Sequence, residues 1–380
     1  GLPAASAAAS VAAGKPHSLL HVDRAEIDLP PTTDHYSDAV YAKAHANFLQ
    51  LQRTGILLRE TEPCLYLYQQ QMGAHVQRGL VAACHVEDYD ANLIKKHEKT
   101  RKDKEDDRTR LIDTLSADTG PVFLTYRDEP AVNALVAQLV KTKPQHDFTA
   151  PDGIRHTAWR IPGGTAWQQA FGQVPVTYIA DGHHRAASAA RVARLRRARN
   201  PQHNGTEDYN WFLCVLFPAS ELKILPYNRH VFDLNGLTPA AFLEKVRANF
   251  GLVEGAAPAP TAVGHVSMYL EGKWYGLRCP VDAQADPVAR LDVSVLQDKL
   301  LAPLLGIDDP RTSKRIDFIG GIRGTGELVQ RVEAQGGVAF SLYPVTIAQL
   351  MDIADAGQIM PPKSTWFEPK LRSGLFVHTF

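Results

Sequence analysis

The spacing of hydrophobic residues switches repeatedly between helical and extended patterns along this chain. Apolar residues that recur every three or four positions predict a helix over residues 34–54. Short runs rich in β-branched and aromatic residues, bounded by polar residues or glycine, predict strands. The predicted strands are residues 19–22, 64–68, 78–86, 122–126, 158–161, 174–179, 211–217, 264–270, 273–278 and 338–342. Further helices are predicted at residues 131–140, 186–199, 239–249, 293–301 and 347–356.

The near alternation of strands and helices predicts an α+β (mixed α/β) fold. Residues 69–77 are expected to form a hairpin-like link between two strands. The pattern of the sequence changes near Leu234, so we expect a domain boundary between residues 235 and 236. Residues 361–370 are polar and punctuated by proline, which predicts neither helix nor strand, but Trp366 and Phe367 predict that this segment is packed.

Composition excludes several classes of protein. The 41 basic and 41 acidic side chains balance, which argues against broad binding to nucleic acid or to an anionic membrane. The longest apolar run is far shorter than the roughly 18 residues that a membrane helix needs. No secretory signal is recognisable at the start of the chain. The four cysteines are widely spaced and form no CxxC pair, which indicates reduced thiols and a cytoplasmic location.

A cluster of ionisable side chains lies where a predicted strand meets a predicted helix. The sequence there is Asp181-Gly182-His183-His184-Arg185. Backbone N–H groups at a helix start are unpaired, and together with an arginine they form a good phosphate site. The carboxylate is suited to act as a general base toward a hydroxyl or to hold Mg²⁺. The alternative is a helix capped by Asp181 with exposed His and Arg.

Residues 95–110 are densely charged and contain the sequence His-Glu-Lys-Thr-Arg at positions 97–101. This is not a zinc-protease motif, because HExxH requires a second histidine where the chain has Arg101. One interpretation is a solvated helix face with ion pairs such as Glu98 with Lys102. The other is that Glu98 and the neighbouring basic groups face the phosphate site.

Three further segments carry candidate phosphate contacts. Arg229 follows the strand at 211–217 and is either a second phosphate clamp or part of a surface turn at residues 226–230. Lys363 supplies one cation beside two hydroxyl side chains. Residues 320–324 are glycine-rich but lack the GK[ST] ending of a P-loop, which favours a plain tight turn. The arginines within residues 185–199 are expected mostly to form a solvated helix face.

Several motifs occur together and in order. They are Gly79, Glu-Asp-Tyr-Asp at 87–90, Ile-Lys-Lys-His-Glu-Lys-Thr-Arg at 94–101, Glu-Asp-Asp-Arg at 105–108, Asp-Gly-His-His-Arg at 181–185, Leu-Pro-Tyr-Asn-Arg at 225–229 and Met-Pro-Pro-Lys-Ser-Thr-Trp-Phe-Glu-Pro-Lys at 360–370. In this combination the chain resembles the DUF1015 family from about residue 15 onward. Members of that family usually begin with a strand and a Pro-Tyr-Asp loop, so the different start at residues 1–13 implies a change in one wall of the expected site.

The DUF1015 family is in turn similar to the ParB/sulfiredoxin superfamily, in which a strand–turn–helix binds nucleotide phosphates. The resemblance implies that Gly182, His184 and Arg185 form this turn. His183 stands where sulfiredoxins carry a reactive cysteine, so sulfinic-acid repair is not expected. Free-serine kinases of the superfamily carry Asp-Gly-x-His-Arg, the pattern found here. The resemblance implies a nucleotide-binding domain over residues 1–235 and a C-terminal α+β domain over residues 236–380, whose tail packs toward the site.

The leading hypothesis is a nucleotide-dependent phosphotransferase, a kinase that acts on a small hydroxyl substrate such as free serine. Phosphoryl transfer requires clustered cations, a metal-holding carboxylate and a base. The cofactor would be a nucleoside triphosphate or diphosphate with Mg²⁺. The phosphate contacts are assigned to Gly182, His184, Arg185 and Arg229, with Lys363 as a further candidate. Asp181 and Glu98 share the roles of base and Mg²⁺ ligand, and the pocket is shaped by His97, Arg101 and His183.

Two alternatives remain open. The first is a ParB-like switch in which nucleotide binding closes a homodimer; neutral charge and the lack of a recognisable helix-turn-helix argue against a DNA-binding form. The second is a non-catalytic protein that binds a small anion, which would need Arg185 and the helix start but neither Asp181 nor Glu98. All three hypotheses involve a small-molecule ligand, and none involves a membrane or nucleic acid.

Overall fold

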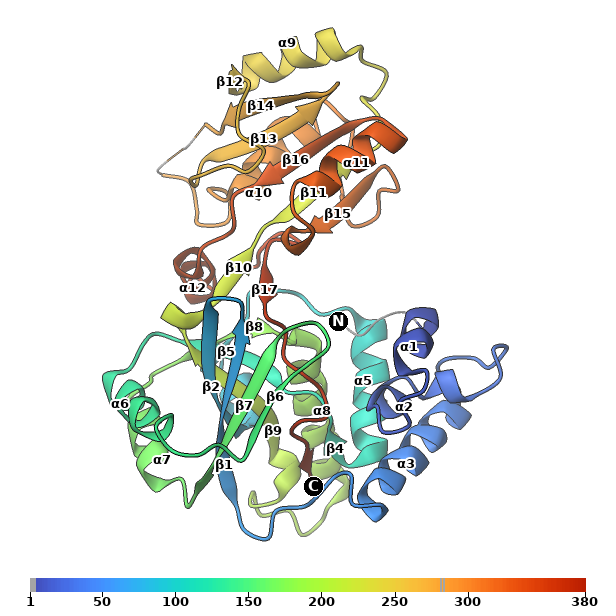
Figure 1. Ribbon diagram of the computed structural model, residues 1–380, viewed down its shortest axis with the longest axis vertical. Helices are drawn as coiled ribbons and strands as arrows, with labels where there is room; N and C mark the ends of the chain where they lie inside the picture. The colour runs from blue at the N-terminus through green and yellow to red at the C-terminus, as the bar shows by residue number, and fades with distance from the viewer. Residues whose placement is uncertain (1–4, 281, 283) are drawn as a thin grey trace. The chain divides into compact units, whose positions relative to one another are not determined.

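The computed structural model describes residues 5–280, 282 and 284–380, and its contacts divide the chain into two compact units (Figure 1). The first unit runs to Leu222 and also includes the C-terminal segment Pro369–Phe380, while the second unit is Lys223–Glu368. This division falls before the boundary expected at residue 235. Each unit contains its own sheet and helices, which confirms the predicted mixed α/β class.

An eight-stranded sheet forms the centre of the first unit, in the order β3-β8-β5-β9-β2-β1-β7-β6. Its strands are β1 (Cys64–Met72), β2 (His75–His85), β3 (Ile94–Lys95), β5 (Val122–Tyr126), β6 (His146–Thr149), β7 (Arg155–Pro162), β8 (Thr177–Asp181) and β9 (Trp211–Pro218). β3 is parallel to β8 and β5 to β9, and the other neighbours are antiparallel. β5 is buried throughout and β9 after its first residue, as their continuous apolar runs predict.

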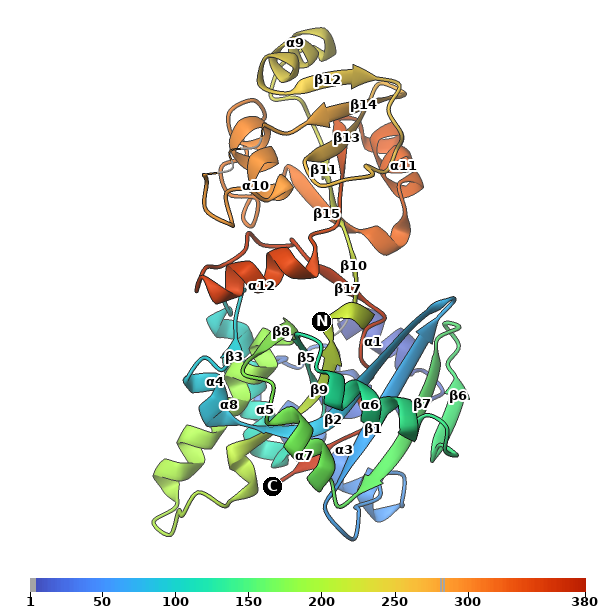
Figure 2. The ribbon, with the colours of Figure 1, turned by 90° about the vertical axis from the view of Figure 1, so that its left-hand side faces the viewer.

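Helices cover one face of this sheet (Figure 2). These helices are α4 (Val86–Asp90), α6 (Pro130–Leu139), α7 (Thr165–Phe171) and α8 (His183–Arg199). Their apolar residues share a core with alternate strand residues such as Leu67 and Leu216. The residues between those alternate positions point to the opposite face. There Phe376 of the C-terminal segment packs against Tyr68, with ring centroids 5.6 Å apart.

A second core of the first unit lies among the helices α2 (Leu20–Asp23), α3 (Asp38–Arg53) and α5 (Lys102–Leu115), and includes Val22, Phe48 and Leu111. The remaining elements of this unit are α1 (Ala5–Ala12), the 3₁₀ turns Ala25–Asp28, Asp208–Asn210 and Ala219–Glu221, and the short strands β4 (Ala117–Asp118) and β18 (His378–Thr379). β4 and β18 form an antiparallel pair, so the last residues of the sequence pack in this unit (Figure 1). Residues 1–4 of the atypical start lie outside the described residues.

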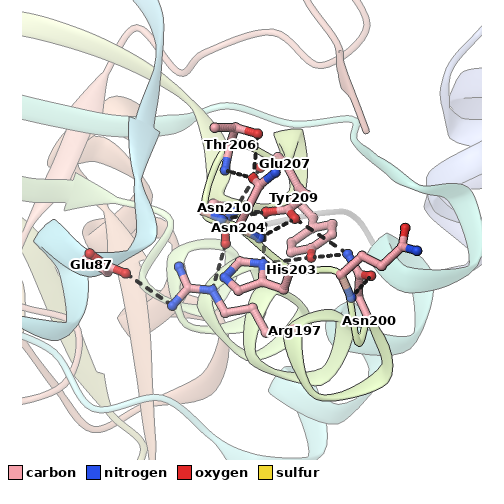
Figure 3. Close-up of polar contacts among 11 residues, drawn as sticks. Glu87, Arg197, Asn200, His203, Asn204, Thr206, Glu207, Tyr209 and Asn210 are labelled. Carbon is pink, nitrogen blue, oxygen red and sulfur yellow. Dashed lines mark hydrogen bonds and ion pairs between the residues drawn. The ribbon is translucent and has the colours of Figure 1, made fainter.

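Helix α8 is held by ion pairs to carboxylates of α4 and α5. The pairs are Arg191 with Asp106, Arg194 with Asp90, Arg196 with Asp113 and Arg197 with Glu87. After the helix ends, Asn200, His203, Glu207, Tyr209 and Asn210 form a hydrogen-bonded network with Arg197 (Figure 3). The arginine face expected to be solvated is therefore largely ion-paired, and these contacts tie the later turns of the helix to α4 and α5.

The second unit is built on a six-stranded antiparallel sheet in the order β12-β14-β13-β16-β11-β15. Its strands are β11 (Tyr227–Val231), β12 (Gly251–Glu254), β13 (His265–Leu270), β14 (Lys273–Arg278), β15 (Ile316–Gly320) and β16 (Val338–Leu342). Its helices are α9 (Pro239–Asn249), α10 (Asp292–Leu296), which continues into a π-helical turn (Gln297–Leu301), α11 (Gly326–Gln335) and α12 (Ile347–Asp355). A separate pair joins β10 (Lys223–Leu225) to β17 (Trp366–Glu368).

Some local predictions are wrong. The strand predicted at residues 19–22 is helix α2, because Leu19 and Val22 lie three residues apart and face one core. The link predicted over residues 69–77 is much shorter, since β1 and β2 remain paired up to Met72 and His75. Part of the irregular segment 361–370 forms strand β17, and the alternative surface turn at 226–230 is largely the buried strand β11.

Two other findings concern the sequence-based expectations about chemistry and location. All four cysteines carry free thiols, and those of Cys214 and Cys279 are buried. None of the helices in the described part of the chain combines the length and apolar character needed to cross a membrane.

Candidate functional site

Gly182 alone joins strand β8 to helix α8, and its conformation shapes the candidate site. Its φ of 100° and ψ of 27° are left-handed, which glycine adopts without the strain of a side chain. A Cβ at this position would lie 2.7 Å from Nη2 of Arg185. The backbone therefore favours glycine, and any side chain at this position would displace the Arg185 guanidinium that folds over it. Because the first N–H groups of a helix lack intrahelical partners, the turn places unpaired donors at the start of α8.

Asp181 lies between two cations. Its Oδ2 accepts a hydrogen bond from Nη2 of Arg185 at 3.0 Å, and Nζ of Lys370 lies 3.7 Å from its Oδ1. Burial by itself raises the pKa of Asp181, but Lys370 and Arg185 outweigh burial and hold the pKa at about 2. Asp181 is therefore a charged carboxylate at neutral pH. Lys370 reaches it from the C-terminal segment of the same unit.

Two imidazoles and a carboxylate meet beside this turn. The rings of His97 and His183 lie edge to face with centroids 4.5 Å apart, and Oε2 of Glu98 lies 3.6 Å from Nδ1 of His183. Both rings are buried, whereas the Glu98 side chain is 53% exposed. Burial lowers the pKa of His97 to about 4 and also that of His183, so both rings are neutral at pH 7. In each neutral ring one nitrogen carries a proton and the other can accept a hydrogen bond or bind a metal. Nε2 of His183 accepts from the backbone N–H of His97 at 3.5 Å.

His184 and Arg101 contact one another through the backbone rather than through two side chains. The N–H of Arg101 donates to Nε2 of His184 at 2.9 Å. Burial lowers the pKa of His184, which fits its role as a hydrogen-bond acceptor here. The Arg101 guanidinium pairs with Asp103 and is 71% exposed. In this structure, Arg101 therefore contributes its backbone to the neighbourhood of the turn, and its guanidinium faces solvent.

The other two predicted phosphate contacts lie together in the second unit. Arg229 is 3% exposed, and its guanidinium donates to the carbonyl oxygens of Tyr227 and, at 3.1 Å, Lys363. Burial lowers the pKa of Arg229 to about 9. The ammonium of Lys363 lies 5.5 Å from the centre of the Tyr227 ring. Arg229 also lines a small cavity with Asp292 and Ser364, which has a volume of about 10 Å³.

The structure thus gathers most of the predicted residues in the first unit, around the start of α8. These are His97, Glu98, Arg101, Asp181, Gly182, His183, His184 and Arg185. Arg229 and Lys363 contact one another in the second unit, and their assignment to the same phosphate site stays a prediction. Sequence reasoning gave no role to Lys370, although this lysine ends the quoted motif at 360–370. It also missed buried Asp23, which accepts a hydrogen bond from Thr119 at 2.6 Å and whose pKa burial raises.

A mixed α/β protein with a cationic helix-start site is the class that these features define. The chain belongs to the DUF1015 family, described as a "Protein of unknown function", whose model matches residues 3–294. The resemblance inferred from the ordered motifs is therefore confirmed at the level of the family. No curated protein matches the chain in a sequence comparison.

Several solved structures resemble the chain weakly. A free serine kinase in complex with AMP is 12% identical, with 76% of this chain and 86% of that chain covered and a TM-score of 0.36. A conserved hypothetical protein from Pyrococcus furiosus is 13% identical, with 77% and 93% covered and a TM-score of 0.36. C-terminally truncated SbnI from Staphylococcus aureus is 12% identical, with 77% and 85% covered and a TM-score of 0.38. Because all three TM-scores lie below 0.5, these likenesses do not establish a shared function.

Proposed function

We propose that the first unit binds the phosphate groups of a nucleoside diphosphate or triphosphate at residues 181–185 and transfers a phosphoryl group to a small hydroxyl substrate such as free serine. One observation carries the proposal: a helix start, the guanidinium of Arg185 and the ammonium of Lys370 converge around Asp181. A phosphate that took the place of the carboxylate would gain two cationic partners and the N–H groups of the helix start.

The two carboxylates differ in what surrounds them. Asp181 presents one oxygen to Arg185 and the other to Lys370, so we assign it to holding these cations in place before the phosphates bind. Glu98 is the more exposed carboxylate, and we assign it to accepting the substrate hydroxyl proton. The hydroxyl oxygen then forms a bond to phosphorus as the bond to the nucleotide oxygen breaks, and the nucleotide leaves with one phosphate fewer.

The described residues do not supply a dedicated Mg²⁺ cage. Mg²⁺ prefers a near-octahedral shell of oxygen ligands, and it is commonly bound by one or two carboxylates together with substrate phosphates. Here the Asp181 oxygens face two cations, and Glu98 lies 3.6 Å from the imidazole of His183. The expectation that Asp181 and Glu98 together hold Mg²⁺ does not fit this geometry, and we assign no step to that ion.

Product formation and nucleotide binding, measured separately, test the proposal. The full chain is incubated with ATP or ADP, Mg²⁺ and a panel of hydroxy metabolites that includes serine, and phosphorylated product is followed by ³¹P NMR. Nucleotide affinity is measured by calorimetry. We expect Arg185→Ala to weaken nucleotide binding at least about tenfold, since it removes a charge-assisted contact. Glu98→Gln should lower kcat about 10²-fold or more while nucleotide affinity stays within threefold.

Arg191→Ala is the matched control. It removes an arginine from the same helix whose partners are Asp106 and Glu105 of α5, so both nucleotide affinity and turnover should match the wild type. Nucleotide binding without product from any acceptor would reject the transferase and favour the switch. Stabilisation by inorganic phosphate alone, unchanged by Asp181→Asn and Glu98→Gln, would favour the anion-binding protein.

A further inference from the structure

The cluster of His97, Glu98 and His183 has the composition and spacing of a metal site. Each residue offers one ligand atom, and the three atoms lie within 4.8 Å of one another. His97 and His183 are 2% and 4% exposed, so their rings have little access to bulk water. Nδ1 of His97 is buried and has no hydrogen-bond partner among the described residues. A buried polar atom without a partner is unfavourable, so this ring has bonding capacity that its protein surroundings do not meet.

We propose that His97, Glu98 and His183 bind one divalent first-row transition-metal cation, such as Zn²⁺ or Mn²⁺, in preference to Mg²⁺. Imidazole nitrogens suit transition metals, whereas Mg²⁺ selects oxygen ligands. Two histidines and one carboxylate leave coordination positions open for water or a ligand oxygen, as in catalytic metal sites. The inference goes beyond the proposed function because metal binding requires neither nucleotide nor phosphoryl transfer.

The spacing requires only a small adjustment. Ligand bonds of about 2.0–2.2 Å allow two ligand atoms on one ion to lie at most about 4.4 Å apart. The side chain of Glu98 is exposed and can move inward, while the two buried rings stay in place. A carboxylate bound through one oxygen keeps the other available. Glu98 can therefore hold the ion and still accept a proton from a hydroxyl.

The surrounding charges predict how this site responds to phosphate. The helix start and Arg185 are positive and disfavour a bare cation, whereas Glu98 and Asp181 are negative and favour it. A phosphate at residues 181–185 would neutralise the positive groups. Metal affinity should therefore rise when phosphate is present, and by linkage the metal should raise phosphate affinity by the same factor.

Co²⁺ is a suitable probe, because its visible absorption reports nitrogen ligation and low coordination number. The full chain is stripped with a chelator and titrated with Co²⁺ without nucleotide, with and without inorganic phosphate. We expect one Co²⁺ per chain, no displacement by a hundredfold excess of Mg²⁺, and displacement by Zn²⁺. Glu98→Gln and His183→Gln should each weaken Co²⁺ binding at least tenfold. His146→Gln, which removes an exposed imidazole on strand β6 of the same unit, is the control and should stay within twofold of the wild type.

Several outcomes would overturn the inference: no saturable Co²⁺ binding, equal competition by Mg²⁺, or equal effects of all three variants. Circular dichroism checks folding, and if the buried His183 variant unfolds, the exposed Glu98 variant decides alone. Because the titration contains no nucleotide, the two proposals fail separately. Absence of Co²⁺ binding would leave nucleotide binding and product formation untouched, and absence of product with normal Co²⁺ binding would reject only the transferase.

Discussion

Arg229 is a buried cation without a carboxylate partner among the described residues, which favours binding of an anion. Among the described residues, its guanidinium has carbonyl partners and the face of the Phe318 ring, 5.1 Å away, but no carboxylate within ion-pair distance. Transferring a cation from water to such a place is unfavourable, and burial accordingly lowers its pKa to about 9. An anion beside this guanidinium would remove much of this cost, and it would have to widen the adjoining cavity of about 10 Å³, which Asp292 also lines.

We therefore predict that phosphate stabilises the second unit through Arg229. In an Arg185→Ala background, which removes the first unit's main phosphate contact, added phosphate should raise the Tm of the chain. Arg229→Met should reduce that increase, although without phosphate it should be as stable as its parent or more stable. The control is Arg331→Met, because Arg331 already pairs with Asp317 and Glu327. An unchanged phosphate response in Arg229→Met would contradict the prediction.

His156 predicts a pH dependence for the first unit. It is completely buried, Tyr68 is hydrogen-bonded to its Nδ1 at 2.7 Å, and Arg372 donates to its Nε2. Burial and the positive charge of Arg372 outweigh nearby Asp152 and lower the pKa of His156 to about 4. The unfolded chain, with a histidine pKa of about 6.5, therefore binds a proton that the folded unit does not bind between pH 6.5 and 4.

Stability should consequently fall as the pH decreases through this window, by up to about 1.4 kcal/mol per pH unit for this one proton. His156→Gln cannot titrate but keeps a polar side chain, so its free energy of unfolding should depend less steeply on pH. Urea titrations at pH 7, 6 and 5 measure both slopes. Parallel slopes for the two proteins would mean that His156 does not carry this linkage.

The turn between β8 and α8 determines the candidate site at the scale of an element. We predict that Gly182→Ala costs about 1–2 kcal/mol from the left-handed backbone. It should also weaken nucleotide binding, because its Cβ would meet the Arg185 guanidinium. Gly205→Ala is a matched control: its φ of 92° imposes similar strain, but a Cβ there would meet nothing within 4 Å. Both variants should lose stability, measured by urea unfolding, and only Gly182→Ala should lose nucleotide affinity. Equal affinities would show that Arg185 is not displaced.

Helices and strands with a regular spacing of apolar residues could be predicted from the sequence, whereas a strand with buried polar residues was missed. Strand β5 and helix α9 lie where the apolar spacing indicates. Strand β11 was not predicted because it contains the polar residues Asn228, Arg229 and His230, although all three are buried. Several of their polar atoms pair with distant backbone groups, such as the N–H of Leu342 that donates to Asn228 and the carbonyl of Gly336 beside Nε2 of His230. Such long-range partners leave no local signal.

The candidate site divides in the same way. The strand–turn–helix and the residues 97–98 could be proposed because each forms a local motif. The pairing of Asp181 with Lys370 could not, since 189 positions separate them and only the folded first unit brings them together. The cluster of His97, Glu98 and His183 likewise joins a loop to the start of a helix. It has no HExxH spacing from which it could be predicted.

At the scale of the whole chain, the second unit is inserted between two parts of the first. The C-terminal segment Pro369–Phe380 completes the first unit by several contacts. The carbonyl of Lys370 accepts a hydrogen bond from the buried Gln70 at 2.8 Å, and that of Pro369 accepts one from Gln77 at 3.3 Å. Phe376 packs on Tyr66 and Tyr68. Deleting the segment would therefore leave two buried amides without these partners and expose apolar surface.

We predict that a chain shortened after Glu368 has a destabilised first unit and an intact second unit. Each lost large apolar side chain contributes about 1.5–3 kcal/mol, and each orphaned buried amide adds about 1–3 kcal/mol. Hydrogen exchange measured by mass spectrometry should accelerate in β1 and β2 but not in β13 and β16, whose partners all belong to the second unit. Lys370→Ala, which removes only the ammonium, should keep wild-type exchange in β1 and β2 while weakening nucleotide binding. If the shortened chain exchanges like the wild type, the segment does not hold the sheet of the first unit together. If exchange accelerates in both units, the second unit depends on the first for its own stability.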